Sequence, residues 1–208
     1  MPEVQSLPLV QIELEKSVEE VFGNTFKREE PQRWVEYGLT FRVAPESLLS
    51  CCQTLKEHRK FLFNMLIDIT AVDFLDSRRE RFDVVYQFLS LTYQSRLCLK
   101  VAVTEEQPAV ASVRSLWAAA NFLEREVWDM YGIDFPGHGD LRRILMYDEF
   151  VGHPLRKDYH IQHKQPRVPL RLPELRNESV DMNKAELVSL PSRQKSLEKQ
   201  SVNEQGAS

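Results

Sequence analysis

Residues 65–103 read MLIDITAVDFLDSRRERFDVVYQFLSLTYQSRLCLKVAV, and apolar residues alternate with other residues in three successive runs. The three runs are residues 65–73, 82–88 and 97–103. Alternation with a period of two is typical of β-strands that bury one face. In the first run the expected buried face consists of Ile67, Ile69 and Ala71. Charged residues 76–81 and the tripeptide Tyr93–Ser95 are expected to form the two connecting turns. The segment therefore predicts three consecutive strands of one sheet.

Helical patterns lie on both sides of these strands. A first helix presents Leu14, Val18, Val21 and Phe22 on one face, and Gly23 can end it. Pro45 can begin a second helix, because its missing N–H is not needed in a first helical turn. The apolar stripe of this second helix is expected to be Leu48, Leu49, Cys52 and Leu55. A third, longer helix is expected to end at Gly132, with an apolar stripe of Leu116, Ala120, Leu123, Val127 and Met130.

Between the first two helices, apolar residues occupy every second position of residues 35–43. This alternation predicts either one long strand or a strand pair, in which Gly38 marks a bulge or a hairpin. The order of elements indicates the α+β class, as a two-layer sandwich whose antiparallel or mixed sheet is covered on one side by helices. Regular β-α-β alternation is absent from the sequence. The short Gly137-His138-Gly139 motif follows a helix rather than a strand, so we do not expect it to bind a dinucleotide.

Composition excludes several classes of protein. The chain has 208 residues and a net charge of −4, which argues against a general nucleic-acid binder. Its three cysteines form no C-x-x-C motif, so we expect no thiolate-bound iron–sulfur cluster or structural zinc ion. The most apolar stretch, residues 61–75, is shorter than the about 20 residues of a membrane span and contains polar residues. We also expect no secretory signal and a reducing compartment.

Three regions with different composition are expected along the chain. Residues 1–132 form the α+β domain, and residues 133–176 form an extended, proline-rich docking segment. Residues 177–208 are polar and lack aromatic residues, and we expect a disordered tail there.

The end of the third helix and the residues after it concentrate charged side chains. Arg125 and Asp129 are four residues apart and can form an ion pair on one helical face. The simplest interpretation is a solvated helix end, with ion pairs of roughly 0.3–0.5 kcal/mol each. Residues 141–145 and 152–158 then place basic residues beside apolar ones. This composition favours a docking strip for another protein, and a basic loop packed on its own domain is the alternative.

Four histidines lie in the same region, at positions 138, 153, 160 and 163. A metal site would require convergent ligands, and histidines beside Pro and Gly are more often turn or interface residues. Neighbouring carboxylates on one helix do not by themselves form a catalytic pair. We therefore expect no metal and no catalytic residue in this chain. The alternative is an independent enzyme that uses this histidine-rich loop and the acidic helix.

Two spaced motifs resemble the signature of the 30-kDa subunit family of respiratory complex I, whose bacterial members are the C subunits of NADH–quinone oxidoreductase. The first motif runs from Glu124 to Leu145, and the second runs from Gly152 to Asp158. The resemblance extends over about residues 12–170. The chain departs from the family at Gly139, where the family usually has Pro, and at Tyr159-His160, where it usually has Phe-Pro.

The resemblance implies a fold of one helix, two strands, one helix, three strands and a further helix. It also implies a core subunit of the hydrophilic arm of a proton-pumping NADH–quinone oxidoreductase that itself holds no redox cofactor. FMN and iron–sulfur clusters in other subunits would transfer electrons from NADH to quinone. This chain would dock onto the 49-kDa-type partner (the bacterial D-type subunit) near the quinone-reducing end, and would also contact neighbouring hydrophilic-arm subunits.

The same resemblance implies a peripheral protein on the cytoplasmic side of the inner membrane, which reaches the membrane only through the complex. The equivalent subunit of a membrane-bound hydrogenase, or of a ferredoxin- or F420-linked complex, is the alternative. The motif residues expected at the partner interface are Glu124, Arg125, Glu126, Asp129, His138, Arg142, Arg143, Gly152, His153, Pro154, Leu155, Arg156, Lys157 and Asp158.

Overall fold

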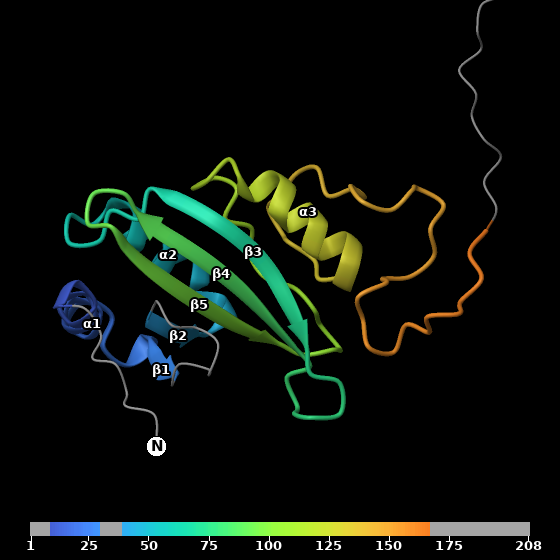
Figure 1. Cartoon of the computed structure of the whole chain (residues 1–208), viewed down its shortest axis with the longest axis horizontal. Helices are drawn as coiled ribbons and strands as arrows, with labels where there is room; N and C mark the ends of the chain where they lie inside the picture. The colour runs from blue at the N-terminus through green and yellow to red at the C-terminus, as the bar shows by residue number, and fades with distance from the viewer. Residues whose placement is uncertain (1–8, 30–38, 167–208) are drawn as a thin grey trace, which may run out of the picture. The chain divides into compact units, whose positions relative to one another are not determined.

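The computed structural model describes residues 9–29 and 39–166 (Figure 1). Its helices and strands, in chain order, are α1 (Leu9–Phe22), β1 (Lys27–Glu29), β2 (Leu39–Val43), α2 (Leu48–Glu57), β3 (Met65–Asp73), β4 (Phe82–Ser90), β5 (Ser95–Val103) and α3 (Ala120–Tyr131). Short 3-10 turns precede β1 and α2. The predicted α+β class and order of elements are confirmed. The predicted polar tail, and the expectations for Val35, Tyr37 and Gly38, lie outside the described residues.

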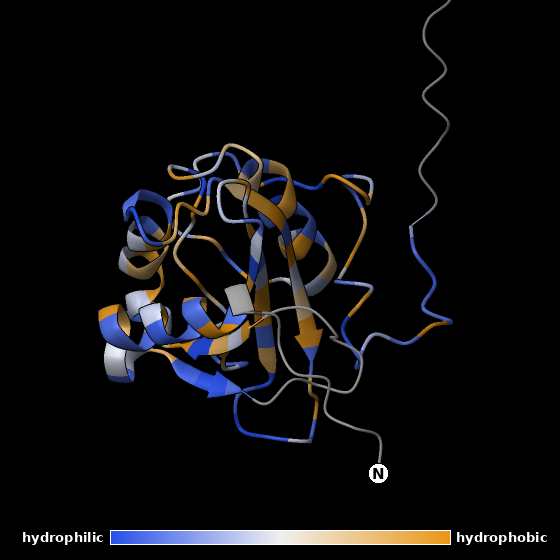
Figure 2. Ribbon diagram, turned by 60° about the vertical axis from the view of Figure 1, so that its left-hand side comes forward, coloured by the Kyte–Doolittle hydropathy of each residue, from blue (hydrophilic) through white to orange (hydrophobic). Residues whose placement is uncertain are grey.

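The five strands form one mixed sheet in the order β1-β2-β5-β4-β3. Strands β2 and β5 are parallel, and the other neighbouring pairs are antiparallel. Figure 1 shows α2 behind the sheet and α3 beside β3. Hydrophobic residues concentrate in the long strands, as the colouring of Figure 2 shows. One face of the sheet is therefore apolar and needs the helices to cover it.

The core lies between this face and the helices. Alternate residues of β4 and β5 are buried there, as their periodicity predicts: Phe82, Val84, Tyr86, Phe88, Leu97, Leu99, Val101 and Val103. From the helices, Leu14, Val18, Leu55, Ala120 and Val127 pack into the same cluster. Residues of all three helices therefore share one core with the sheet.

Two predicted buried positions are wrong. Ile67 is exposed, because the β3–β4 register shifts between Leu66 and Asp68 and the bulge exchanges the faces of the sheet at this point. Leu66 takes the buried position. On α2, Leu49 is exposed and Cys51 completes the buried stripe instead.

The turn between β4 and β5 is also displaced from its predicted position. Ser95 pairs with Ser90 and belongs to β5, so the turn consists of residues 91–94, with Gln94 at a φ of 50°. The third helix is shorter than predicted, because Leu116 lies in a turn before it. The predicted end at Gly132 is confirmed: this residue has a φ of 72°, in the left-handed region that glycine tolerates.

The chain that follows α3 begins inside the core. Ile133 and Phe135 are buried, and Asp134 bridges to Ala109 in a parallel arrangement. The predicted division into residues 1–132, 133–176 and 177–208 as a whole stays a prediction. No helix in the described part of the chain has the length and apolar character needed to cross a membrane.

Candidate functional site

The charged motif residues meet around the end of α3, where the chain returns across the helix. We call residues 140–166 the strap. It contains no helix or strand among its described residues, so its backbone polar groups need partners from elsewhere in the chain.

Asp129, in the last turn of α3, is the first of these partners. Its Oδ2 accepts hydrogen bonds from the backbone N–H groups of Ile144, Leu145 and Met146, at 3.1, 2.9 and 2.9 Å. Its Oδ1 accepts one from Arg143 Nη1 at 2.5 Å. Burial alone would raise the pKa of this carboxyl, but the three N–H groups and the guanidinium keep it below its usual range. Asp129 therefore binds the strap as a fixed anion.

Arg143 connects Asp129 to a later part of the strap. Its Nη2 donates to the carbonyl oxygens of Phe150 and Gly152, at 2.8 and 3.2 Å. The guanidinium also lies 5.8 Å from the ring centroid of Trp128. One arginine thus closes the strap into a loop against α3.

Arg125 holds the same part of the strap from the preceding turn of α3. Its Nε and Nη2 donate to the carbonyl oxygens of Arg142 and Arg143, at 3.2 and 3.1 Å. The predicted ion pair between Arg125 and Asp129 is therefore wrong, since both side chains turn to the strap. The solvated helix end is wrong as well, because Glu124, Arg125 and Asp129 are buried. Glu126, the remaining charged residue of this helix segment, is exposed.

The second motif satisfies the carbonyl groups at the end of α3. A helix leaves its last four carbonyls without partners inside the helix. The four donors that replace them are Gly132 N to Trp128 O (2.8 Å), His153 Nδ1 to Asp129 O (3.0 Å), Leu155 N to Met130 O (3.1 Å) and Arg156 Nε to Tyr131 O (2.6 Å). Three of the donors come from the second motif, which therefore acts as the C-terminal cap of α3.

His153 fits under the helix end because residue 132 is glycine. A Cβ on Gly132 would lie 2.6 Å from Cδ2 and Nε2 of the imidazole. The bond to the Asp129 carbonyl places the ring proton on Nδ1. Burial lowers the pKa of His153, and the guanidinium groups of Arg156 and Arg143 lower it further against the opposing effect of that carbonyl.

Arg81 fixes the end of the second motif to the sheet. It donates two hydrogen bonds to the Asp73 carboxylate, at 3.0 and 2.9 Å, and two to Asp158, at 3.1 and 2.7 Å. Asp73 also accepts the backbone N–H of Lys157 at 2.8 Å. Sequence patterns predict a strand position for Asp73 and a turn for Arg81, and they do not reveal this role. One feature of the sequence points to this role: Asp73 follows Ile69 and Ala71 in the alternation, so its carboxylate is expected on the buried face of the strand.

Glu124 and His138 hold the other end of α3. Ser112 Oγ and Val113 N donate to the Glu124 carboxylate at 2.6 and 2.7 Å, and burial raises the pKa of this group above its usual range. His138 Nδ1 accepts the N–H of Asp140 at 3.2 Å, so Nε2 carries the proton toward the Asn121 carbonyl at 3.0 Å. The left-handed φ of Gly139, 83°, is inaccessible to the proline that the family usually has there.

The structure thus brings together most of the predicted site residues through the chain's own contacts. Arg142, Leu155 and Lys157 direct side chains outward, and Pro154 is half-buried beside them. Among residues 9–29 and 39–166 there is no group of three His, Cys, Asp or Glu residues that could hold a metal ion. The sequence left open whether residues 141–145 and 152–158 form a docking strip or a basic loop packed on its own domain. One side of the strap packs on the domain, and the other side is exposed.

The model of the family "Respiratory-chain NADH dehydrogenase, 30 Kd subunit" matches residues 41–165, which run from within β2 through α3 and nearly the whole strap. The chain belongs to this family. The C subunit of NADH-quinone oxidoreductase from Geobacter sulfurreducens is 46% identical over 124 residues, which are 60% of this chain and 75% of that protein. Its counterpart from Roseiflexus is 47% identical over 120 residues, or 58% of this chain and 68% of that protein.

Two solved structures share the fold of this member of the 30-kDa subunit family. A trypsin-resistant fragment (1-134) of Nqo5 has a TM-score of 0.54 and 37% identity, with 62% of this chain and 99% of the fragment covered. A chain of an archaeal membrane-bound sulfane sulfur reductase has a TM-score of 0.58 over 73% of this chain and 86% of that chain. Its identity is 21%, so it shows the fold alone. The relatives are subunits of an enzyme complex, and this chain is a homologue of complex I subunits.

Replacement of Asp129 by Asn should destabilise the chain by about 2 kcal/mol, because the charge that pairs with Arg143 is lost and the amide NH2 group then faces the Arg143 donor. Urea unfolding measures this loss, and Glu126→Gln on the exposed side of the same helix is the matched control. The folded pKa of Asp129 is lowered, so its contribution is complete above pH about 4 and is lost as the pH falls through that folded pKa. Equal stabilities of the two variants would contradict the role of Asp129.

Replacement of Gly132 by Ala should cost about 2 kcal/mol or more, because the left-handed backbone is strained and the new Cβ displaces His153. Gly23→Ala is the control, since its φ of 51° is also left-handed but nothing lies within 4 Å of the new Cβ. Thermal or urea unfolding should show a larger loss for Gly132→Ala. In a His153→Ala background the excess should disappear, and an excess that persists would rule out the clash.

Proposed function

We propose that this chain is the 30-kDa-type core subunit of the hydrophilic arm of a proton-pumping NADH–quinone oxidoreductase. It docks onto the 49-kDa-type partner near the quinone-reducing end of the complex, and it contacts neighbouring hydrophilic-arm subunits. Membership of the 30-kDa subunit family supports the proposal, together with the match to bacterial C subunits over about two thirds to three quarters of their length.

The observation that carries the docking role is the construction of the strap. A chain segment without regular secondary structure is held by Asp129, Arg143 and Arg125, while many of its apolar side chains remain exposed. Apolar side chains held exposed on a fixed backbone are available to bind another protein. In this proposal the family motifs build the surface and position it for the partner.

In the proposed complex, other subunits bind NADH, FMN and the iron–sulfur clusters and transfer electrons to quinone, and proton translocation is coupled to this transfer. This chain contributes binding and position. Its thiols support that division: Cys51, Cys52 and Cys98 are buried, and burial raises their pKa values, whereas metal ligation requires the thiolate. We further propose a location on the cytoplasmic side of the inner membrane, with membrane contact only through the complex.

An affinity-tagged chain expressed in its own organism tests the proposal. Purification from detergent-solubilised membranes should recover a 49-kDa-type protein together with FMN-dependent NADH–quinone oxidoreductase activity. A nickel-binding large subunit in its place would support the hydrogenase-type alternative. Recovery of the tagged chain only as a free monomer would contradict both assignments.

The same purification can test the role of the motif residues. Arg143→Ala should reduce the amount of complex recovered at least about tenfold, because loss of one partner leaves the buried Asp129 carboxylate unpaired and releases the strap. Arg28→Ala is the control, since Arg28 is a half-exposed residue of the edge strand β1 that pairs with Glu15. Equal recovery of complex with the two variants would show that the strap is not part of the interface.

A further inference from the structure

We propose that Glu124 is a proton-binding site inside the fold, at which the folded chain holds the neutral carboxyl more strongly than the unfolded chain does. Release of this proton as the pH rises destabilises the fold, so the first half of α3 contains a pH-sensitive element. The inference is independent of the proposed function, because the groups around this carboxyl all belong to the chain itself.

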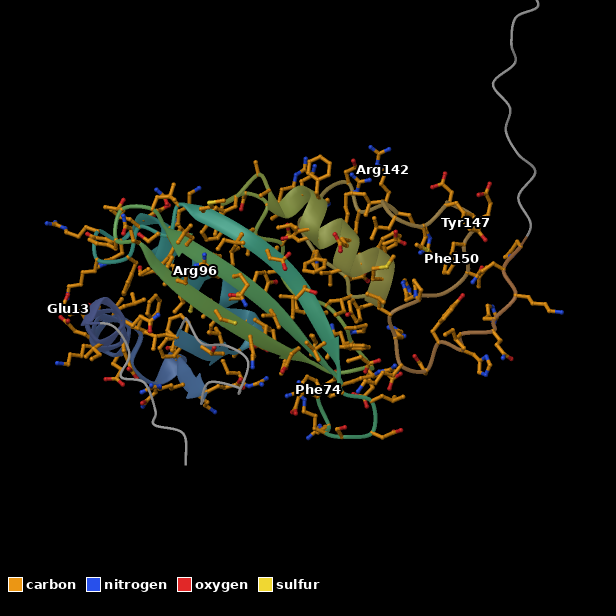
Figure 3. All side chains as sticks on the ribbon, viewed as in Figure 1. Glu13, Phe74, Arg96, Arg142, Tyr147 and Phe150 are labelled. Carbon is orange, nitrogen blue, oxygen red and sulfur yellow. The ribbon has the colours of Figure 1, made fainter. Side chains whose placement is uncertain are left out.

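Glu124 and Asp129 are buried carboxyls on different sides of α3. They are five residues apart, which places them about 140° apart around the helix axis. Figure 3 shows the strap, with Tyr147 and Phe150 labelled, on the side of α3 away from the sheet. Asp129 is bound by the strap, whereas the partners of Glu124 come from the segment before α3. The two carboxyls therefore meet different surroundings.

The donors that reach Glu124 are few and uncharged. Ser112 Oγ donates to the carboxylate at 2.6 Å and the backbone N–H of Val113 at 2.7 Å. No lysine or arginine of residues 9–29 and 39–166 forms an ion pair with it. Asp129, by comparison, has three N–H donors and a guanidinium. A buried carboxylate without a bound cation is destabilised by the loss of its hydration.

His138 lies beside Glu124 but is neutral in this geometry. Its Nε2 is 4.0 Å from Oε2 of Glu124, which is too far for a hydrogen bond. Nε2 donates instead to the Asn121 carbonyl, and Nδ1 accepts the N–H of Asp140, so the ring carries a single proton. Arg114 is exposed, and its guanidinium donates to the backbone carbonyl of His138. Neither side chain binds the carboxylate as a cation.

From β4 and α2, Tyr86 and Cys52 face the same part of the core. Both are fully buried. Burial raises the pKa of each group, and the nearby carboxylate of Glu124 raises both pKa values further. Tyr86 Oη also has no hydrogen-bond partner among the residues that the structure describes. Both side chains are therefore neutral, and this side of the core offers Glu124 no charge.

The hydroxyl of Ser112 can serve either form of Glu124. It accepts the N–H of Arg114 at 3.2 Å with one lone pair, so it can still donate to a carboxylate or accept from a carboxylic acid. The neutral carboxyl also keeps the bond from Val113, so Glu124 loses no hydrogen bond on protonation. Burial is then the largest effect, and it raises the pKa of Glu124 against the opposing effects of Ser112, Val113, His138 and Arg114.

The raised pKa determines the sign of the pH dependence. Below the ordinary glutamate pKa of about 4.3, the stabilisation by the bound proton is complete. It is lost as the pH rises from there through the raised pKa of Glu124. Asp129 responds in the opposite direction, because its folded pKa is lowered. Two buried carboxyls of one helix are thus expected to show opposite pH dependences.

Urea unfolding of the full-length chain over a series of pH values tests the inference with Glu124→Gln. The amide can keep both hydrogen bonds and cannot ionise. As the pH rises, the folding equilibrium constant of this variant, relative to that of the unaltered chain, should increase about tenfold for each unit by which the pKa of Glu124 is raised. The same ratio for Asp129→Asn should decrease with rising pH. Glu126→Gln, on the exposed side of the helix, is the matched control and should change little.

A 13C NMR titration of the unaltered chain, labelled at its glutamate carboxyl groups, measures the same proton without a variant. The Glu124 resonance should titrate with a midpoint above the ordinary value of about 4.3. A midpoint at or below that value would overturn the proposal. A ratio for Glu124→Gln that decreases with rising pH, as for Asp129→Asn, would overturn it as well, because Glu124 would then act as an anion paired with a protonated His138.

Discussion

The carboxylate of Asp129 is the constraint on which the rest of the site depends. It lies in the last turn of α3, where the negative end of the helix dipole disfavours an anion and where the helix has no basic residue. Four donors from the strap satisfy it, and the second motif returns donors to the carbonyl groups of the same helix end. Helix and strap therefore exchange hydrogen bonds in both directions, and neither has its partners without the other.

This exchange explains why the two family motifs are separated in sequence and still act together. The first motif supplies the acceptor in α3 and the arginines around it, and the second supplies the caps of the α3 carbonyls. Arg81 then joins the end of the second motif to β3 through Asp73 and Asp158. The motifs thus encode the position of an irregular segment relative to a rigid sheet, which is a suitable basis for a subunit whose proposed role is to bind other subunits.

The periodicity of the sequence predicted the elements well, because strands β4 and β5 and the helices bury one regular face each. It failed where a tertiary feature overrides the local period. Ile67 is exposed because of a bulge, which alternation alone does not reveal. The Arg125–Asp129 pair was predicted from helical spacing, but the strap offers both residues better partners, and spacing along one helix carries no information about a segment that returns to it. Arg81 was missed for the same reason, since its partners are 8 and 77 residues away. The grouping of motif residues was found from the resemblance, and their division into inward and outward side chains required the structure.

The contacts of Asp129, Arg143 and Arg125 hold the strap against α3 in the free chain, before any partner binds. Amide hydrogen exchange of the isolated full-length chain tests this most directly, at the N–H groups of Ile144, Leu145, Met146 and Leu155. We expect slow exchange at these four amides, and fast exchange at 144–146 once Asp129 is replaced by Ala, because their common acceptor is then absent. Exchange in the unaltered chain at the rate of an unstructured peptide would show that the free chain does not hold the strap, which would then acquire its structure only from the partner.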